Sequence, residues 1–283
     1  MLDIRRKKAI AASLCSMVSV QSGASIAKIL FHHLGAGGAA SLRTGFAGLI
    51  LLLLNRPNIR KITREQWLCI LFYGISTGAM NLIFYYGVQR IPLGVGVTVE
   101  YLGPLGLALI RSRKATDFLW ALLAGLGVFL IVPWSKQQTA NGIDPIGLGL
   151  VFLAGVMWAS YIVAGRTISH KMKSSDAAAC GMCVASVLIL PFGIFSGDLF
   201  HLTWKLTGLG VCVALLSSVF TFTLDLYALK DIPSKVFSVF QSLQPAVAAT
   251  AGLIFLREYL SITQCLAIFF VIVASMGAAL SSD

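Results

Sequence analysis

The sequence predicts an all-α integral membrane protein with ten transmembrane helices, arranged as two inverted repeats of five helices each. Three observations predict this fold: an apolar composition with long apolar segments, a one-sided distribution of basic residues, and a motif that occurs twice. Hydrophobic residues make up 57% of the chain, and charged residues make up only 12%. This composition is typical of helices that contact lipid rather than water.

Apolar segments of about 20 residues recur along the chain, and each is long enough to cross the hydrocarbon core as a helix. The first follows a basic N-terminal segment, but its apolar run is longer than a signal-peptide core, so we expect an uncleaved helix. The connections are short, so we expect no separate soluble domain. The ten expected spans are 9–30, 35–54, 66–88, 92–110, 117–134, 145–165, 177–196, 205–229, 234–256 and 261–280.

Basic residues gather in the loops on one side of these spans. With the N-terminus inside, 16 of the 22 Lys and Arg residues lie in inside loops and 5 lie outside; the remaining one, Arg43, falls within the second span. This bias predicts that both termini are cytoplasmic. The net charge of +11 is therefore an orientation signal that can also contact anionic lipid heads, and we expect no nucleic-acid partner.

A motif at 91–104, IPLGVGVTVEYLGP, returns 141 positions later at 232–245 as IPSKVFSVFQSLQP. In each copy a polar side chain follows the first proline by eight residues, and a second proline comes four residues later. The halves 1–140 and 141–283 hold five spans each, an odd number, so the second half enters the membrane from the opposite face. Such an inverted repeat typically surrounds a site near the membrane midplane.

The second prolines of the motif, Pro104 and Pro245, are expected to kink their helices. A proline inside a helix has no N–H to donate to the carbonyl four residues earlier. The carbonyls of Glu100 and Gln241 are therefore expected to be free, beside a polar side chain, in both halves.

Glu100 is the strongest candidate for a functional residue, because an ionisable group in the middle of a span costs roughly 2.5–3.5 kcal/mol. Small residues and a proline surround it on its helix, which leaves room for a ligand or for water. A structural reading, a carboxylate that binds a neighbouring helix, is the alternative. We favour the functional reading, in which Glu100 holds either a proton or a substrate ammonium group and so couples their movement.

Other polar side chains repeat at helical spacing and could line a lumen. On the third span these include Asn81 and Tyr85, and on the ninth span Gln241, with Gln244 close to its stripe. For Ser and Thr, hydrogen bonds within or between helices are the better explanation. For Asn81 and Gln241 the two readings are equally supported. A further stripe, on the eighth span, comprises Ser218, Thr221 and Asp225.

Arg43 could receive a substrate carboxylate, since its guanidinium offers two parallel donors. Its long side chain could instead reach the outer interface, and this second reading is slightly preferred. Asp225 lies five residues before Lys230, so an interfacial ion pair is expected there rather than a deep site. Lys28 is interpreted as an anchor at the outer interface.

Several classes of protein have no support in the sequence. There is no G-x-x-x-x-G-K-[ST] motif for ATP, and no H-E-x-x-H or buried Ser–His pattern for an intramembrane enzyme. Cys180 and Cys183 form a C-x-x-C pair, but they lie in an apolar helix, where a redox role is not expected. We therefore expect no enzyme activity, no metal and no cofactor.

The motifs resemble the drug/metabolite transporter superfamily, in its ten-helix EamA-type branch. Within that branch they are most similar to the bacterial threonine/homoserine exporters. One departure is Arg257, where the family's late motif more often has glycine before Glu258. The stretches that carry the resemblance are SVQSGASIAKILF (19–31), LFYGISTGAMNLIFYYGVQRIPLG (71–94), VEYLGPLGLAL (99–109), DFLWALLAGLG (117–127), MWASY (157–161), QSLQPAVAA (241–249) and GLIFLRE (252–258).

This resemblance covers essentially the whole chain. It implies an exporter of small hydrophilic amino acids in the bacterial inner membrane, driven by proton exchange. A broader drug or metabolite exporter, or an importer that runs the same cycle backwards, is the alternative within transport. A passive channel explains the inverted repeat less well, and an intramembrane enzyme is the remotest alternative.

The distribution of basic residues predicts where reporter fusions will lie. Reporters placed after Lys61, after Lys173 and at the C-terminus should all be cytoplasmic, because basic loops are retained inside. A reporter near Gln138 should be periplasmic. Paired alkaline phosphatase and fluorescent-protein fusions measure this, and a periplasmic C-terminus would contradict the ten-span arrangement.

Overall fold

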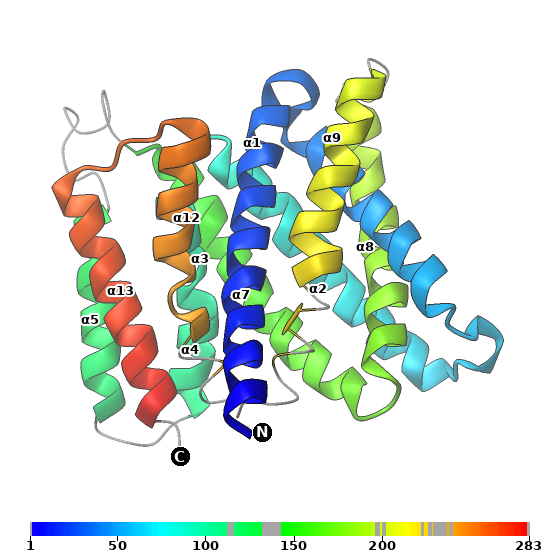
Figure 1. The fold of residues 1–283 in the computed structure, drawn as a ribbon, viewed down its shortest axis with the longest axis horizontal. Coiled ribbons are helices and arrows are strands. Elements are labelled where there is room, and N and C mark those ends of the chain that lie inside the picture. The colour runs from blue at the N-terminus through cyan, green and yellow to red at the C-terminus, as the bar shows by residue number, and fades with distance from the viewer. Residues whose placement is uncertain are drawn as a thin grey trace.

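The computed structural model describes residues 2–111, 116–131, 143–195, 199, 202–221, 224, 225, 228, 237 and 240–281. Every regular element within these residues is helical, and the helices stand side by side as one bundle (Figure 1). The predicted all-α class is confirmed. Both termini lie at the same end of the bundle, as an even number of crossings requires (Figure 1).

The elements follow the predicted spans closely, although several spans are divided and one helix covers two of them. A 3₁₀ turn, η1 (Ile59–Lys61), connects α1 to α2, and two π-helical segments, η3 and η4, continue α9 and α12. The elements are α1 (Leu2–Asn55), α2 (Arg64–Val88), α3 (Leu93–Glu100), α4 (Leu102–Arg111), α5 (Thr116–Ile131), α7 (Pro145–Ser169), α8 (Ser174–Phe195), α9 (Trp204–Ala214), η3 (Leu215–Phe220), α12 (Gln244–Ala251), η4 (Gly252–Leu256) and α13 (Ile262–Ser281).

The first two predicted spans form α1, which is sharply kinked at Gly35. This residue has φ 58° and ψ 175°, a conformation that glycine adopts readily because it has no Cβ. A break was expected between residues 30 and 35, and the structure puts it at the end of that interval. The two arms of α1 can therefore run in different directions and contact different neighbours.

The fourth and ninth spans are each divided near the middle, beside Glu100 and Gln241. Helix α3 ends at Glu100 and α4 begins at Leu102. In the second half, turn residues separate Gln241 from α12, which begins at Gln244. Pro104 and Pro245 both lie in the first turn of the helix that follows the break, and neither has an N–H to donate to the carbonyl four residues earlier. The interruptions expected at these two prolines therefore coincide with the two breaks.

The carbonyl of Glu100, freed by Pro104 as predicted, faces a neighbouring helix. A Cβ on Gly155 of α7 would lie 2.5 Å from this carbonyl oxygen, and one on Gly103 would lie 1.8 Å from the carbonyl oxygen of Gly155. Two glycines therefore allow the backbones of α3, α4 and α7 to touch. Such close approach between small residues is typical of helix contacts in membranes.

Helices from the two halves pack against one another in pairs. Helix α3 packs on α12, α5 packs on α13, and the second arm of α1 packs on α8. These pairs join the fourth span with the ninth, the fifth with the tenth and the second with the seventh. This is the pairing expected around a pseudo-twofold axis, and the inverted relation of the halves stays a prediction.

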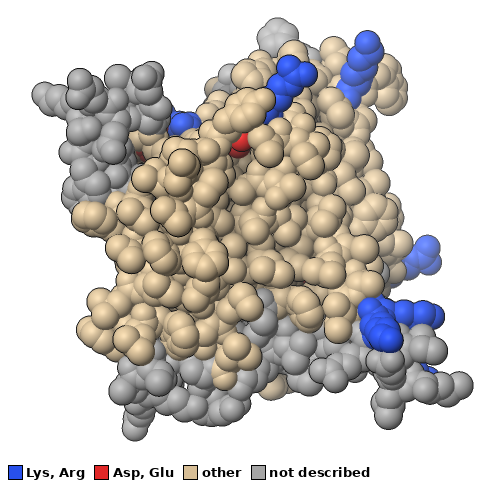
Figure 2. Space-filling model, turned by 60° about the vertical axis from the view of Figure 1, so that its left-hand side comes forward, with Lys and Arg blue, Asp and Glu red and all other residues tan. Residues whose placement is uncertain are grey.

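The outer surface of the bundle suits a lipid environment. Four described helical segments are long and apolar enough to cross a membrane: Lys7–Asn55, Arg64–Val88, Pro145–Ser169 and Ser174–Phe195. Large apolar side chains such as Leu54, Phe195 and Ile262 are exposed on the bundle. On the face seen in Figure 2, uncharged residues cover the centre and Lys and Arg side chains lie towards the edges.

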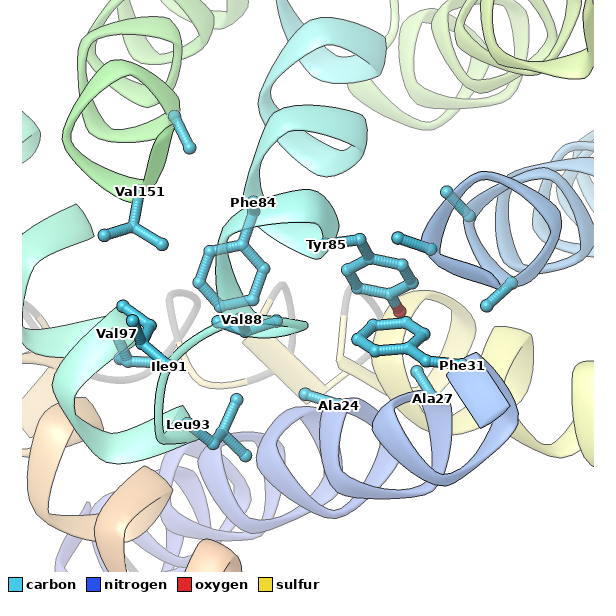
Figure 3. Packing of buried hydrophobic residues seen from close by; sticks show 14 of the residues in the cluster. Ala24, Ala27, Phe31, Phe84, Tyr85, Val88, Ile91, Leu93, Val97 and Val151 are labelled. Atoms are coloured by element: carbon cyan, nitrogen blue, oxygen red, sulfur yellow. The ribbon is translucent and has the colours of Figure 1, made fainter. Parts of the chain in front are cut away.

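The end of the bundle away from the termini is filled by a tightly packed apolar core. The rings of Phe31 and Tyr85 meet edge to face, with centroids 5.2 Å apart. Ala24 and Ala27 lie beside them on α1, and Leu93 extends the packing to α3 (Figure 3). This packing joins α1, α2 and α3 at that end.

The contact between Glu100 and Gly155 gives a stability prediction. Gly155→Ala should destabilise the protein by about 1–3 kcal/mol, because the added methyl group overlaps the backbone of α3. The matched control is Gly149→Ala on the same helix, where a Cβ meets nothing within 4 Å. Melting temperatures of the two variants in detergent measure the effect. A Gly155→Ala variant as stable as the control would contradict the close contact.

Candidate functional site

A cavity of about 790 Å³ lies inside the bundle. The elements that line it are α1, α2, α3, α4, α7, α8, η3, α12 and α13, with residues next to η3 and α12. Its lining runs from Gln21 and Glu100, near the middle of the bundle, towards Leu107 and Ala278. These last two lie near the ends of α4 and α13, on the side of the termini (Figure 1). The volume is within the range that small-molecule sites occupy.

Glu100, the last residue of α3, projects into this cavity from the break in the fourth span. Its side chain is buried, with 8% of the residue exposed. Within the part of the chain that the structure describes, its carboxylate accepts no hydrogen bond and forms no ion pair. A buried carboxylate without partners is costly, so the site is complete only with a proton, water or a cationic group.

Arg43 lines the same cavity from the second arm of α1. Its Nη1 donates to the Tyr85 hydroxyl at 3.2 Å and its Nη2 donates to the Ser217 carbonyl at 3.3 Å. The guanidinium also lies 5.5 Å from the centre of the Tyr85 ring. The slightly preferred expectation that Arg43 reaches the outer interface is therefore wrong: these contacts turn it inwards.

The guanidinium of Arg43 is incompletely paired. Arginine has five N–H groups, and the buried Nε of Arg43 has no acceptor. Arg43 and Glu100 line the same cavity and interact electrostatically, but they form no ion pair with each other. The cavity thus presents one cation and one anion that are both incompletely paired.

Asp225 is a second acidic residue of the cavity, whereas the sequence analysis expected an interfacial ion pair there rather than a site residue. It lines the cavity beside Thr221, and its Oδ1 is buried without a hydrogen-bond partner, although Ser16 bonds to the side chain. The expected partner Lys230 lies outside the described residues. Asp225 lies on the stripe that the sequence analysis identified on the eighth span, and Ser218 and Thr221 of that stripe line the same cavity.

Most of the other predicted site residues line the cavity. Asn81, Gln241 and Gln244 line the cavity, and so does Pro104. Asn81 also donates to the Thr77 carbonyl at 2.8 Å, which is the structural role weighed for it. Pro245 is buried and does not line the cavity.

Tyr85 does not contact the cavity itself but holds Arg43, which does. It is fully buried, does not line the cavity, and holds Arg43 through its hydroxyl group. Ser218 and Thr221 line the cavity, as their stripe predicted, and Thr77 does so on α2. The two polar stripes therefore face a common space.

The sequence analysis missed Gln21, an amide on the first arm of α1. Its Nε2 donates to Gln244 Oε1 at 2.6 Å, and Gln244 Nε2 donates to Gln241 Oε1 at 2.9 Å. The sequence did contain a feature that could have identified Gln21, namely an amide side chain within an apolar helix. Such a group needs a polar partner in a lipid environment. Aromatic side chains that were also missed complete the wall: Tyr101 and Trp158 meet edge to face at 5.3 Å.

No group of three or more His, Cys, Asp or Glu side chains within the described residues could hold a metal ion. Cys180 and Cys183 are free thiols between packed helices, away from the cavity. The groups that the cavity offers are an arginine, two carboxylates, amides and hydroxyls, which suit binding of a small polar molecule.

A polytopic helical bundle that encloses a charged and polar cavity defines the class of small-molecule membrane transporters. Comparison with known proteins identifies the family: the chain belongs to the EamA-like transporter family, whose sequence model matches residues 7–133 and 145–280. The predicted resemblance is confirmed. The protein is therefore a multi-pass membrane protein of a transporter family that acts on small molecules.

Curated relatives are similar over nearly the whole chain. The threonine/homoserine exporter RhtA of Salmonella typhimurium is 39% identical over 270 residues, which are 95% of this chain and 90% of the relative. RhtA of Escherichia coli K12 is 38% identical over 270 residues, which are again 95% of this chain and 90% of the relative. The uncharacterized transporter YvbV of Bacillus subtilis is 24% identical, over 79% of this chain and 76% of YvbV.

A solved crystal structure has the same fold. It matches with a TM-score of 0.60 and covers 96% of this chain and 98% of its own, at 14% sequence identity. At this identity the similarity concerns the fold alone.

Proposed function

We propose that this protein is a secondary active exporter of small hydrophilic amino acids of the threonine and homoserine type. It would work in the bacterial inner membrane, with both termini in the cytoplasm and with proton exchange as the driving force. One observation carries the proposal: Arg43 and Glu100, incompletely paired, line one buried cavity. The relatives named as threonine/homoserine exporters support it.

The two charges match the groups that all amino acids share. A zwitterion brings an ammonium group, which needs an anionic partner once water is removed, and a carboxylate, which suits the fork of a guanidinium. Glu100 would hold the ammonium group. Arg43, held in place by Tyr85 and the Ser217 carbonyl, would hold the carboxylate with its free donors.

Competition at Glu100 would couple transport to protons. A buried carboxylate without other partners holds one cation at a time, either a proton or an ammonium group. A proton that binds from outside would displace the amino acid. After the protein reorients, release of that proton to the cytoplasm would prepare Glu100 for the next substrate.

Export also requires that the cavity open to one side at a time. In the orientation that the basic loops predict, the cavity would face the cytoplasm, and the packing around Phe31 and Tyr85 would lie at the outer end. Alternating access in inverted repeats is a rocking of one half against the other. The described state would accept substrate from the cytoplasm.

An ion pair between the halves would hold this state closed. Lys28 Nζ lies 2.6 Å from Glu258 Oε1, and both side chains are mostly buried, so Lys28 is not the free interfacial anchor that its position suggested. Lys28 also donates to the Ile91 carbonyl, and Glu258 Oε2 accepts from the Leu93 N–H at 2.7 Å. These bonds connect the first arm of α1 with the start of α3 and with the turn that follows η4.

The turn that presents Glu258 depends on Arg257, the residue that departs from the family pattern. Arg257 has φ 55° and ψ 36°, the left-handed conformation that usually favours glycine. The turn is therefore formed in spite of the substitution, and it directs Glu258 back towards Lys28.

The role of Glu100 is tested in proteoliposomes with an imposed pH gradient. The wild-type protein should accumulate labelled threonine against its concentration gradient, whereas Glu100→Gln should reduce this transport about 10- to 100-fold, because a charge-assisted bond to the ammonium group is lost. Glu100→Asp should keep partial activity. Glu65→Gln, on the surface of α2, is the matched control and should transport normally.

Dissipative flow without uphill transport in the wild-type protein would indicate a channel and reject the proposal. Wild-type transport by Glu100→Gln, at equal levels in the membrane, would return Glu100 to a structural role. The substrate carboxylate and ammonium sites would then have to involve Arg43 and Asp225.

The closing role of Lys28 and Glu258 is tested by access from outside. In a cysteine-free background that carries Val20→Cys in the cavity, Lys28→Met or Glu258→Gln should make the thiol react severalfold faster with an impermeant external reagent. The control is Arg90→Met, which removes an exposed ion pair with Asp144. Exposed pairs contribute about 0–1 kcal/mol, so its labelling should not change. Equal labelling in all variants would contradict the closing role.

A further inference from the structure

Three glutamine side chains form a hydrogen-bonded chain on the wall of the cavity, here called the glutamine ladder (Gln21, Gln244 and Gln241). The links measure 2.6 Å between Gln21 and Gln244 and 2.9 Å between Gln244 and Gln241. Gln21 and Gln244 are buried, with 5% and 8% exposed, and all three residues line the cavity. The ladder joins the first arm of α1 to the break in the ninth span.

The ladder uses only part of its hydrogen-bonding capacity. Within the described part of the chain, Gln21 Oε1 receives no donor and the amide nitrogen of Gln241 has no acceptor. The positions of oxygen and nitrogen in each amide are assigned from the hydrogen bonds. If all three amides were turned over, the unpaired oxygen and the unpaired nitrogen would exchange ends. In either direction, and counting only partners among the described residues, one end of the ladder has an acceptor without a donor and the other has a donor without an acceptor.

A hydroxyl group can accept from a free donor and can also donate to a free acceptor, so it can pair with either end of the ladder. The charged residues cannot select a hydroxylated amino acid, because every zwitterion has the same ammonium and carboxylate groups. Selection must come from neutral polar groups near the charged pair. Tyr101, which follows Glu100, is hydrogen-bonded to Ser242, which follows Gln241, so the ladder lies next to the anionic end of the site.

We propose that the glutamine ladder recognises the side-chain hydroxyl group of the transported amino acid. This inference rests on the proposed function and adds the basis of its substrate selection. Arg43 and Glu100 orient the zwitterion, and its side chain then lies against the ladder. An analogue with a methyl group in place of the hydroxyl leaves buried amide groups unpaired and is rejected.

Counterflow of labelled threonine in proteoliposomes tests this proposal. The competitors are threonine against valine, which replaces the hydroxyl with a methyl group, and homoserine against 2-aminopentanoate, which does the same on a longer side chain. The wild-type protein should prefer the hydroxylated member of each pair by about 10- to 100-fold. Gln21→Met and Gln244→Met keep the length of the side chain but remove its amide, and each should reduce this preference to less than about threefold.

The preference should fall because the hydroxylated substrates bind more weakly, while valine binds as before or better. Gln241→Met removes only the hydrogen bond between Gln244 and Gln241. This variant is measured instead if Gln21→Met or Gln244→Met does not reach the membrane. Ser217→Ala is the comparison, since its hydroxyl also lines the cavity and is buried without a partner. If Ser217→Ala abolishes the preference while the ladder variants keep it, the hydroxyl is recognised by Ser217 and the proposal is overturned.

Two further results separate the ladder from the proposed function. If the wild-type protein shows no counterflow of any amino acid, the proposed function fails. If it transports threonine and valine equally well, amino-acid transport stands and only the ladder is rejected. If the Met variants lose transport equally for the hydroxylated and the methylated amino acid of a pair, the ladder has only a structural role. That result would also reject recognition of the hydroxyl group by the ladder.

Discussion

Backbone groups in a lipid environment must find partners within the protein, and the site of this transporter depends on how that requirement is met. The breaks after Glu100 and Gln241 lie inside the bundle, where α7 covers the first and the glutamine ladder borders the second. Glycines 103 and 155 let the backbones touch, so the break after Glu100 excludes lipid. The polar cavity lies beside these breaks and is lined by residues of several helices from both halves of the chain.

The two ends of the bundle differ in a way that follows from the same packing. Small and aromatic side chains of α1, α2 and α3 close the end away from the termini, and the Lys28–Glu258 pair ties the helices together there. A buried ion pair is weak evidence for stability, since desolvation offsets much of the attraction. Its position between the halves instead suits a contact that forms in one state and separates in another.

Recognition in the cavity divides between charged and neutral groups. Arg43 and Glu100 suit the groups common to all amino acids, and the glutamine ladder suits a feature that only some side chains carry. Both depend on positioning residues behind the cavity wall: Tyr85 holds Arg43, and Gln244 holds Gln21 and Gln241 in register. If the two proposals hold, the lining of the cavity combines a general site with a selective one.

The sequence by itself determined the membrane class, the number of apolar spans, the repeated motif and the deep position of Glu100, because these depend on hydrophobicity and order along the chain. The tertiary structure decided which way the long side chains point. Arg43 turns inwards, Lys28 pairs with Glu258, and Gln21 meets Gln244, each through a partner more than 40 positions away in the sequence. Helical spacing defines the faces of one helix, but not which neighbour each face meets. Asp225 shows the same limit: its stripe with Ser218 and Thr221 was visible in the sequence, but only the packed bundle showed that this stripe faces the cavity.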